Sequence, residues 1–425
     1  MSFKNVGAKT ILMQKEIVKD FSWDFKGVDT KEFTHGVHSY PAMMIPQVAR
    51  RLIQENGKEA KLGLDPFCGS GSVLLEFNLA GIKSYGVDIN PLAVLISRVK
   101  NTVVSPEKLR ETKHKLQTKI NETMNQKNIE TPNFFNIDFW FKTPVIKKLA
   151  VIKKAIDAIE DENIRNFFLA CFSETVRKTS NTRAGEFKLY RINHEKLVAH
   201  NPDAYLVFKK IIEKNIQSME NLYNELKQKN NVKVIEDNIL QTTNIPEKSI
   251  DLLVTSPPYG DSRTTVAYGQ FSRLGLQWLG ISDEIVRKLD KVSLGGIASK
   301  SIDCNLPSEN LKETIHKIAA YDEQRAREVL SFFEDFYEAS KNINSLMKDK
   351  STMCFVVGNR TVKGVQIPTA KIITEFFKEF GFENIKTIIR NIPSKKMPRK
   401  NSPSNKPGIL SSTMNQEHIV ILKRD

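Results

Sequence analysis

Several patterns that mark common protein classes are missing from this chain of 425 residues. Its four cysteines are scattered and form no C-x-x-C pair, which argues against a structural zinc site and against a disulfide framework. The seven histidines show no metal-binding spacing, so we expect no metal site. No run reaches the ~18 apolar residues of a membrane span, and the first residues contain no apolar signal-peptide region. These absences predict a cytoplasmic protein without a membrane partner.

Negative charge is also in short supply. Asp and Glu number 49 against 64 Lys and Arg, which gives a formal net charge of +15. A protein this basic suggests a polyanionic partner, usually nucleic acid, although a generally basic proteome is the alternative explanation. The hydrophobic content of 40% supports a real core. The length allows two or three domains, or one domain with a large insertion.

The strongest local pattern is a strand–turn–helix–strand unit. A strand at 61–64 leads into the turn Asp-Pro-Phe-Cys-Gly-Ser-Gly at 65–71, then a helix at 72–80 and a second strand at 84–87. Gly69 and Gly71 permit a tight turn and close approach of a ligand. Asp88 ends the second strand, where an acid can hydrogen-bond ribose hydroxyls. The glycine spacing is not G-x-G-x-x-G, so a nucleoside without a pyrophosphate fits better than a dinucleotide. Asp65 would lie near a cationic or amino-bearing group of it.

A second strand end carries polar groups at 255–259. The apolar strand 250–254 runs into Thr-Ser-Pro-Pro-Tyr, where two prolines cannot continue the hydrogen-bond ladder. Ser256, the carbonyls around Pro257 and Pro258, and the ring of Tyr259 are therefore presented where open α/β sheets bind ligands. An ordinary turn is the alternative. A further strand at 231–238 contains Asp237, which could accept a hydrogen bond from an adenine amino group.

The remaining pattern is helical or irregular. Helical segments are expected at 46–53, 91–101, 105–125, 144–180, 203–229, 321–347 and 370–380, with strands at 352–357, 382–390 and 418–422. Residues 1–32 give no clear signal, and 260–279 and 283–318 are expected to be irregular. We divide the chain into a cofactor-binding half (1–104), a helical insertion with possible target recognition (105–230) and a catalytic half (231–425). In this last part, loops 260–320 and 393–416 are expected to contact the nucleic-acid partner.

Three segments combine cations with amide, hydroxyl and aromatic side chains, a mixture that suits phosphate and base contacts. A solvated or disordered surface loop is the alternative interpretation for the segments at 177–191 and 393–408. The candidate nucleic-acid-binding residues are Arg177, Lys178, Arg183, Lys188, Arg191, Arg263, Arg273, Lys395, Lys396, Arg399 and Lys400.

The turn at 65–71 with Asp88, followed later by Ser256-Pro257-Pro258-Tyr259, resembles the DNA amino-methyltransferases that use S-adenosylmethionine. The segment 33–53 is similar to the cofactor motif of that family that closes over the methionine end. The resemblance implies a Rossmann-like class I methyltransferase sheet, an α/β fold that is mostly parallel with one antiparallel closing strand, here with a large helical insertion. The implied cofactor-binding residues are Phe33, His38, Pro41, Asp65, Pro66, Phe67, Gly69, Gly71, Asp88, Ile89 and Asp237.

Ser256 and the tail from 357 to 408 look like one subgroup, the restriction–modification enzymes that methylate the cytosine amino nitrogen (N4). This resemblance implies double-stranded DNA as substrate, base flipping, and a cognate restriction endonuclease as functional counterpart. The Ser256 hydroxyl and the Pro257 carbonyl would accept hydrogen bonds from the target amino group, and Tyr259 would offer a stacking face. Cys68 lies in the cofactor turn, so we interpret it as a small turn residue and not as a nucleophile. Adenine-N6 methylation, RNA methylation and a non-catalytic nucleic-acid-binding module are the alternatives.

Overall fold

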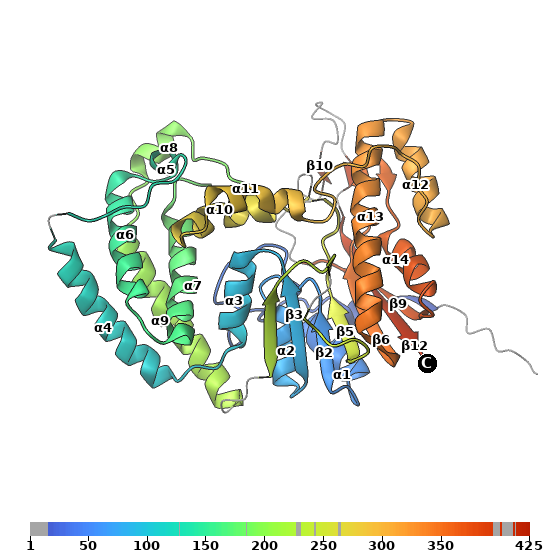
Figure 1. Ribbon diagram of the computed structural model, residues 1–425, viewed down its shortest axis with the longest axis horizontal. Coiled ribbons are helices and arrows are strands. Elements are labelled where there is room, and N and C mark those ends of the chain that lie inside the picture. The colour runs from blue at the N-terminus through green and yellow to red at the C-terminus, as the bar shows by residue number, and fades with distance from the viewer. Residues whose placement is uncertain are drawn as a thin grey trace, which may run out of the picture.

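The structure is a computed structural model that describes residues 16–126, 128–183, 185–226, 231–241, 244–261, 265–393, 400–401, 411–412 and 414–425. Its centre is an eight-stranded sheet (Figure 1). The strands are β1 (Glu16–Lys19), β2 (Leu62–Asp65), β3 (Lys83–Asp88), β4 (Val232–Glu236), β5 (Ile250–Thr255), β6 (Met347–Val357), β9 (Glu383–Asn391) and β12 (Gln416–Arg424). Two short ribbons pair β7 (Thr361–Val362) with β8 (Val365–Gln366), and β10 (Lys400–Asn401) with β11 (Ser411–Ser412).

The strand order of the sheet is β1-β9-β12-β6-β5-β2-β3-β4. In the described part of the chain, β12 pairs antiparallel with β6 and β9, and the other neighbours in this sheet pair in parallel. This confirms the predicted sheet with one antiparallel closing strand. The order reverses between β2 and β5, so the carboxyl ends of these strands flank the crevice where open sheets bind ligands.

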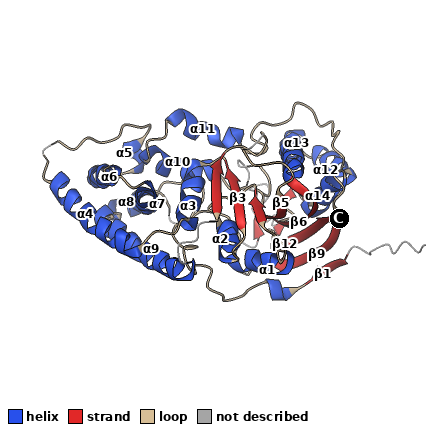
Figure 2. Cartoon of the chain, turned by 60° about the horizontal axis from the view of Figure 1, so that its bottom comes forward, coloured by secondary structure: helices blue, strands red, loops and turns tan. Residues whose placement is uncertain are grey.

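Helices cover both faces of the sheet (Figure 2). The 3-10 helix η1 (Phe21–Trp23), α1 (Pro46–Asn56) and α2 (Ser72–Leu79) pack on one face, and α3 (Pro91–Asn101) lies beside α2 at the β3–β4 end. The other face is covered by α12 (Glu309–Ala319), α13 (Glu323–Leu346) and α14 (Thr369–Lys378). Side chains of β5 alternate between the two faces. Leu252 and Val254 pack with residues of α1 and α2, while Leu253 packs with residues of α12, α13 and α14.

The region inserted between α3 and β4 is helical, as the sequence predicts. It consists of α4 (Pro106–Met124), α5 (Ile137–Trp140), α6 (Thr143–Asp157), α7 (Glu162–Thr179), α8 (His194–Ala199) and α9 (Ala204–Leu226). The expected single segment at 144–180 is two helices, because Asp161 caps a new helix by accepting a hydrogen bond from the backbone N–H of Ile164. Four of these helices, α4, α6, α7 and α9, share one apolar cluster, which also contains Leu274 and Trp278 from the catalytic half.

Two predictions of irregular structure were wrong. Residues 260–279 contain α10 (Tyr268–Trp278), and residues 283–318 contain α11 (Asp283–Val292) and nearly all of α12. The α10 sequence has glycines and a serine, so its helix depends on burying Phe271, Leu274 and Trp278. The other two helices begin at serine N-caps, Ser282 and Ser308, a signal present in the sequence. Residues 16–19, which gave no signal, form β1 by pairing in parallel with β9.

Candidate active site

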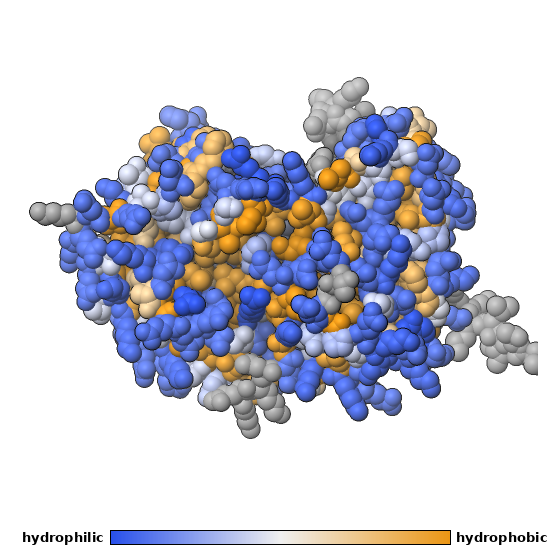
Figure 3. Space-filling model, viewed as in Figure 1, coloured by the Kyte–Doolittle hydropathy of each residue, from blue (hydrophilic) through white to orange (hydrophobic). Residues whose placement is uncertain are grey.

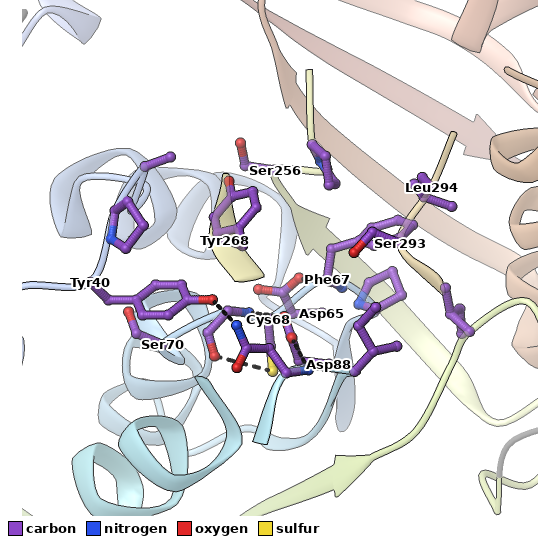
Figure 4. A pocket seen from close by; sticks show the side chains of 18 of the residues that line it. Tyr40, Asp65, Phe67, Cys68, Ser70, Asp88, Ser256, Tyr268, Ser293 and Leu294 are labelled. Atoms are coloured by element: carbon purple, nitrogen blue, oxygen red, sulfur yellow. Dashed lines mark hydrogen bonds between the residues drawn. The ribbon is translucent and has the colours of Figure 1, made fainter. Parts of the chain in front are cut away.

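A cavity lies at the carboxyl ends of β2, β3 and β5, beneath α10 and the end of α11 (Figure 4). Its empty volume is about 1020 Å³ including the part open to solvent, and it is lined by residues from 40–44, 65–73, 88–90, 237–239, 256–258, 268–269 and 289–294. A site of this size at the topological switch point is suited to a nucleoside-sized ligand. Both motifs singled out in the sequence open into this one cavity.

The glycine turn and Asp88, the last residue of β3, are joined by a hydrogen bond. Gly69 has a φ of 48°, which favours glycine, and its backbone N–H donates to Asp88 Oδ2 at 2.9 Å. Asp88 Oδ1 accepts from the backbone N–H of Asn90 at 2.8 Å. Burial raises the pKa of Asp88 to about 6. A carboxylate can accept about four hydrogen bonds, so two acceptor positions of Asp88 remain for ligand hydroxyls.

Asp65 joins the two motifs directly. Its Oδ1 accepts from Thr255 Oγ1 at 2.6 Å and from the Phe67 backbone N–H at 3.2 Å. Thr255 is the last residue of β5, so this bond ties the cofactor turn to the strand that presents Ser256. Burial raises the pKa of Asp65 to about 7. Among the described residues, neither Asp65 nor Asp88 forms an ion pair, so both carboxyl groups can serve a ligand.

Ser256 lines the cavity and begins a chain of hydrogen bonds leading away from it. Its Oγ lies 3.2 Å from Tyr259 Oη, and Tyr259 Oη donates to Glu417 Oε1 at 3.0 Å. Glu417, on β12, also forms a buried ion pair with Arg390 of β9. Arg390 is held in turn by the Trp23 carbonyl, 2.8 Å from its Nε. Ser256, which follows β5, and Glu417, on β12, are therefore brought together by strands that are distant in sequence.

Most predicted cofactor residues line the cavity. These are Pro41, Asp65, Pro66, Phe67, Gly69, Asp88, Ile89 and Asp237, together with Ser256 and Pro258 from the second motif. Five predicted site residues are not among its lining residues, namely Phe33, His38, Gly71, Pro257 and Tyr259. The cavity is therefore lined by residues at the strand ends, but not by every residue of the two motifs.

The reasons for those five exceptions differ. Phe33 packs against the helical cluster. His38 is buried beside α7, with its Nε2 3.0 Å from Ser173 Oγ, and burial lowers its pKa to about 4. A Cβ on Gly71 would lie 2.2 Å from Ser97 Oγ, so this glycine allows α2 and α3 to approach each other. Pro257 is buried, and Tyr259 is positioned by its hydroxyl group.

The cavity also contains residues that the motifs did not reveal. Tyr40 stacks on Tyr268 with ring centroids 6.0 Å apart, and its hydroxyl accepts from Asn90 Nδ2 at 3.1 Å. The same Asn90 nitrogen donates to Ser272 Oγ at 2.7 Å, so the 40–44 segment and α10 meet over the cofactor turn. Only the Asn-Pro helix start at 90–91 was visible in the sequence, because α10 was expected to be a loop.

Cys68 lines the cavity as a buried thiol. Burial, followed by the nearby Asp88, raises its pKa well above the ordinary range for a cysteine. The thiolate is the nucleophilic form of cysteine, and this site disfavours it. The geometry agrees with the interpretation of Cys68 as a small residue of the turn.

The predicted nucleic-acid-binding cations divide into packed and exposed groups. Arg177 lies 4.0 Å from the ring centroid of Phe271, and Arg191 lies 4.2 Å from that of Phe139, so both guanidinium groups also stabilise the fold. Lys178 and Arg183 are exposed, and Lys188 and Arg273 are half-buried. Arg263, Lys395, Lys396 and Arg399 lie outside the described residues, and for Lys400 only the backbone in β10 is described.

Apolar residues gather on one face of the molecule. Figure 3 shows hydrophobic residues in the middle of the face seen in Figure 1, with hydrophilic residues around them. Among the residues that line the cavity, Val292 and Leu294 are apolar. None of the helices in the described ranges is both long and apolar enough to cross a membrane.

Residues 7–98, which contain the glycine turn and Asp88, match the DNA methylase family of N6- and N4-directed enzymes. Fold, cavity and this match define an S-adenosylmethionine-dependent DNA methyltransferase. More specifically, the chain belongs to the type II methyltransferases of restriction–modification systems, since it is 44% identical to the type II methyltransferase M.MvaI of Kocuria varians. That similarity spans 421 residues, 94% of this chain and 93% of the relative.

Other similarities are partial. M.MjaII, a type II methyltransferase of Methanocaldococcus jannaschii, is 35% identical over 94 residues, 21% of this chain and 18% of that protein. Among solved structures, TrmN from Thermus thermophilus covers 90% of this chain and 49% of its own length with 9% identity and a TM-score of 0.30.

Proposed function

We propose that the protein methylates the exocyclic N4 nitrogen of cytosine at a specific sequence in double-stranded DNA. The observation that supports this proposal most directly is that Ser256 lines the same cavity as Gly69 and Asp88. A hydroxyl acceptor for the target amino group and a nucleoside site for the methyl donor are therefore adjacent. Serine in this position is typical of the cytosine-N4 subgroup that the sequence resembles, and this favours cytosine over adenine.

The residues of the cavity fit S-adenosylmethionine, which supplies a methyl group activated by its sulfonium when bound. We assign Asp88 to the ribose hydroxyls, since its oxygens keep free acceptor positions. Asp237 would accept from the adenine amino group, and Asp65 would face the amino group of the methionine end. The 40–44 segment forms the wall at that end.

We assign Ser256 the task of directing the nitrogen lone pair. An exocyclic amino group is a poor nucleophile because its lone pair is delocalised into the ring. If Tyr259 donates to Glu417 and Ser256 donates to Tyr259, the Ser256 oxygen presents only acceptor lone pairs to the cavity. Accepting an amino hydrogen there, together with the Pro257 carbonyl, would pull the nitrogen towards tetrahedral geometry. The same chain offers the released amino proton a route to Glu417.

The DNA would have to present its target base extrahelically, because a duplex hides the amino group from the Ser256 hydroxyl. The aromatic and apolar lining residues Tyr268, Val292 and Leu294 support this, since an extruded base stacks between such side chains. The predicted cations and the helical insertion would contact the phosphates and the recognition sequence. The proposal includes a cognate restriction endonuclease as functional counterpart and action in the cytoplasm, where chromosomal DNA would be modified.

The test is nucleoside mass spectrometry with base-resolution sequencing of DNA from cells that express the protein. We expect N4-methylcytosine at one recurring sequence, and none from cells that express a Ser256→Ala variant. N6-methyladenine at a recurring sequence would instead establish the adenine alternative. Unmodified DNA alongside methylated RNA from the same cells would contradict both DNA assignments.

A further inference from the structure

Lys100, at the end of α3, is a charged residue in an unusual position. Its side chain is fully buried, with 0% of the residue exposed. Its Nζ lies 3.2 Å from Ser70 Oγ, 3.2 Å from Ser72 Oγ and 4.0 Å from Met43 Sδ. Burial lowers the pKa of Lys100 to about 7, and no carboxylate of the described residues offsets this effect. A buried ammonium without an anion is costly, so an anionic ligand close to Lys100 would be stabilising.

The surroundings of Lys100 lead to the cavity. Ser70, Ser72 and Met43 all line it, so the ammonium lies one side chain behind its wall. An ammonium has three N–H donors and no acceptor, so both serine oxygens accept from it. Each serine must then donate its own hydrogen elsewhere. With the cavity on their open side, the two hydroxyls are prepared to donate to an acceptor inside it.

The same wall is closed by the segment that precedes α1. Thr34 Oγ1 donates to the backbone carbonyl of Lys100 at 2.6 Å, which ties this segment to the end of α3. The segment then contributes Tyr40 to Met44 to the cavity lining. Lys100 is therefore held by the segment 34–44 through its backbone and by Ser70 and Ser72 through its side chain. Both parts of the chain contribute residues to the cavity lining.

We propose that Lys100, with Ser70 and Ser72, binds the carboxylate of the methionine end of S-adenosylmethionine. That carboxylate is the only anionic group of the ligand. The other charged side chains lining the cavity are Asp65, Asp88 and Asp237, which would repel it. The carboxylate thus belongs at the Lys100 wall, while the hydroxyls and amino groups of the ligand face the acids. The inference rests on the cofactor and is independent of the choice between cytosine and adenine.

The test compares two ligands that differ only in this group. S-adenosylmethionine and its decarboxylated analogue are titrated calorimetrically into the full chain without DNA. For the unmodified protein, we expect the analogue to bind about 10- to 100-fold more weakly, the range for a charge-assisted hydrogen bond. In Lys100→Met, whose side chain has a similar length but no charge, this ratio should fall below about 10-fold, because only the two serine hydroxyls remain to bind the carboxylate. A ratio as large in Lys100→Met as in the unmodified protein would overturn the proposal.

Two further variants separate a binding role from a structural one. Lys115→Met removes an exposed lysine of α4 and should leave the ligand ratio unchanged. The double variant Ser70→Ala, Ser72→Ala keeps Lys100 and should lower the ratio, so the proposal stays testable if Lys100→Met does not fold. An unchanged ratio in the double variant would show that the serine hydroxyls do not bind the carboxylate, and would also contradict the proposal.

Discussion

At the scale of single residues, buried ionisable side chains surround the cavity, and their charged forms are unfavourable until a ligand pairs with them. Asp65 and Asp88 are buried acids with raised pKa values, and Lys100 is a buried base with a lowered one. In a site built for stability alone, such groups would be paired or replaced by apolar side chains. Perturbed pKa values of this kind cluster at functional sites, and here they surround one cavity.

Asp65→Asn tests this account through pH. The folded pKa of Asp65 is about 7, above its usual 3.8, so its stabilising effect is complete below about pH 4 and is lost as the pH rises through 7. Asparagine mimics the protonated form and keeps the acceptor for Thr255. We expect the variant to match the unmodified protein near pH 4 and to be more stable above pH 7, on the order of a few kcal/mol.

Urea unfolding of the ligand-free protein between pH 4 and 8 measures that difference. Calorimetry should show weaker S-adenosylmethionine binding in the same variant, because a charge facing the ligand amino group is lost. Equal stability of the two proteins at pH 8 would show that Asp65 is not held protonated by its surroundings.

Tyr259→Phe distinguishes two roles for this residue. Phenylalanine keeps a stacking face but cannot connect Ser256 to Glu417. We expect turnover to fall about 2- to 10-fold, the value of one hydrogen bond, with unchanged cofactor affinity. Steady-state methylation assays with calorimetry provide both quantities. Full activity would leave stacking as the function of Tyr259 and remove the relay.

At the scale of elements, the sequence predicts what local pattern determines. β2, the glycine turn, α2 and β3 were predictable because turn chemistry, apolar spacing and the acid at Asp88 agree within one short segment. α10 and the relay to Glu417 were not, because Phe271 and Trp278 gain their burial from distant helices, and β12 brings Glu417 to Tyr259 through long-range pairing. Lys100 was overlooked because one lysine in a helix gives no pattern.

Trp278→Ala tests the joint between α10 and the helical insertion. Its ring packs against Phe134, Phe141 and Phe172 with centroid distances of 5.7–6.0 Å. We expect a loss of about 3–5 kcal/mol in the free energy of unfolding, measured by urea denaturation. Tyr321→Ala, at a residue 74% exposed, is the control and should change stability by less than about 0.5 kcal/mol. Equal effects of the two variants would argue that α10 does not depend on this packing.

At the scale of the whole molecule, a sheet with a cavity at its strand ends is flanked by a helical insertion in a chain of net charge +15. The family and the methyl donor could be predicted from two strand ends because the chemistry fixes the residue types there. The recognition sequence could not, because base readout depends on the placement of individual side chains, which no sequence pattern in the proposed recognition segments fixes.

The basic segment can be tested through salt dependence. Replacing Lys395, Lys396, Arg399 and Lys400 with alanine should weaken DNA binding and flatten its dependence on salt, by about 0.9 in the logarithmic slope for each phosphate that the protein no longer neutralises. Fluorescence anisotropy at several salt concentrations measures the slope. A matched variant removes four exposed lysines outside the insertion and outside the loops proposed to contact DNA, namely Lys26, Lys58, Lys350 and Lys378. If both variants changed the slope equally, the effect would reflect net charge alone.

The most direct test of the central claim is single-turnover methyl transfer by Ser256→Ala at saturating S-adenosylmethionine, with cofactor affinity measured on the same preparation. Ser256 is proposed to act on the target amino group and not on the cofactor. The account predicts a transfer rate lower by about 10²-fold or more, comparable to the loss of one preorganised hydrogen bond to a transition state, with unchanged cofactor affinity. An unchanged rate, or a loss matched by an equal loss of cofactor affinity, would contradict it.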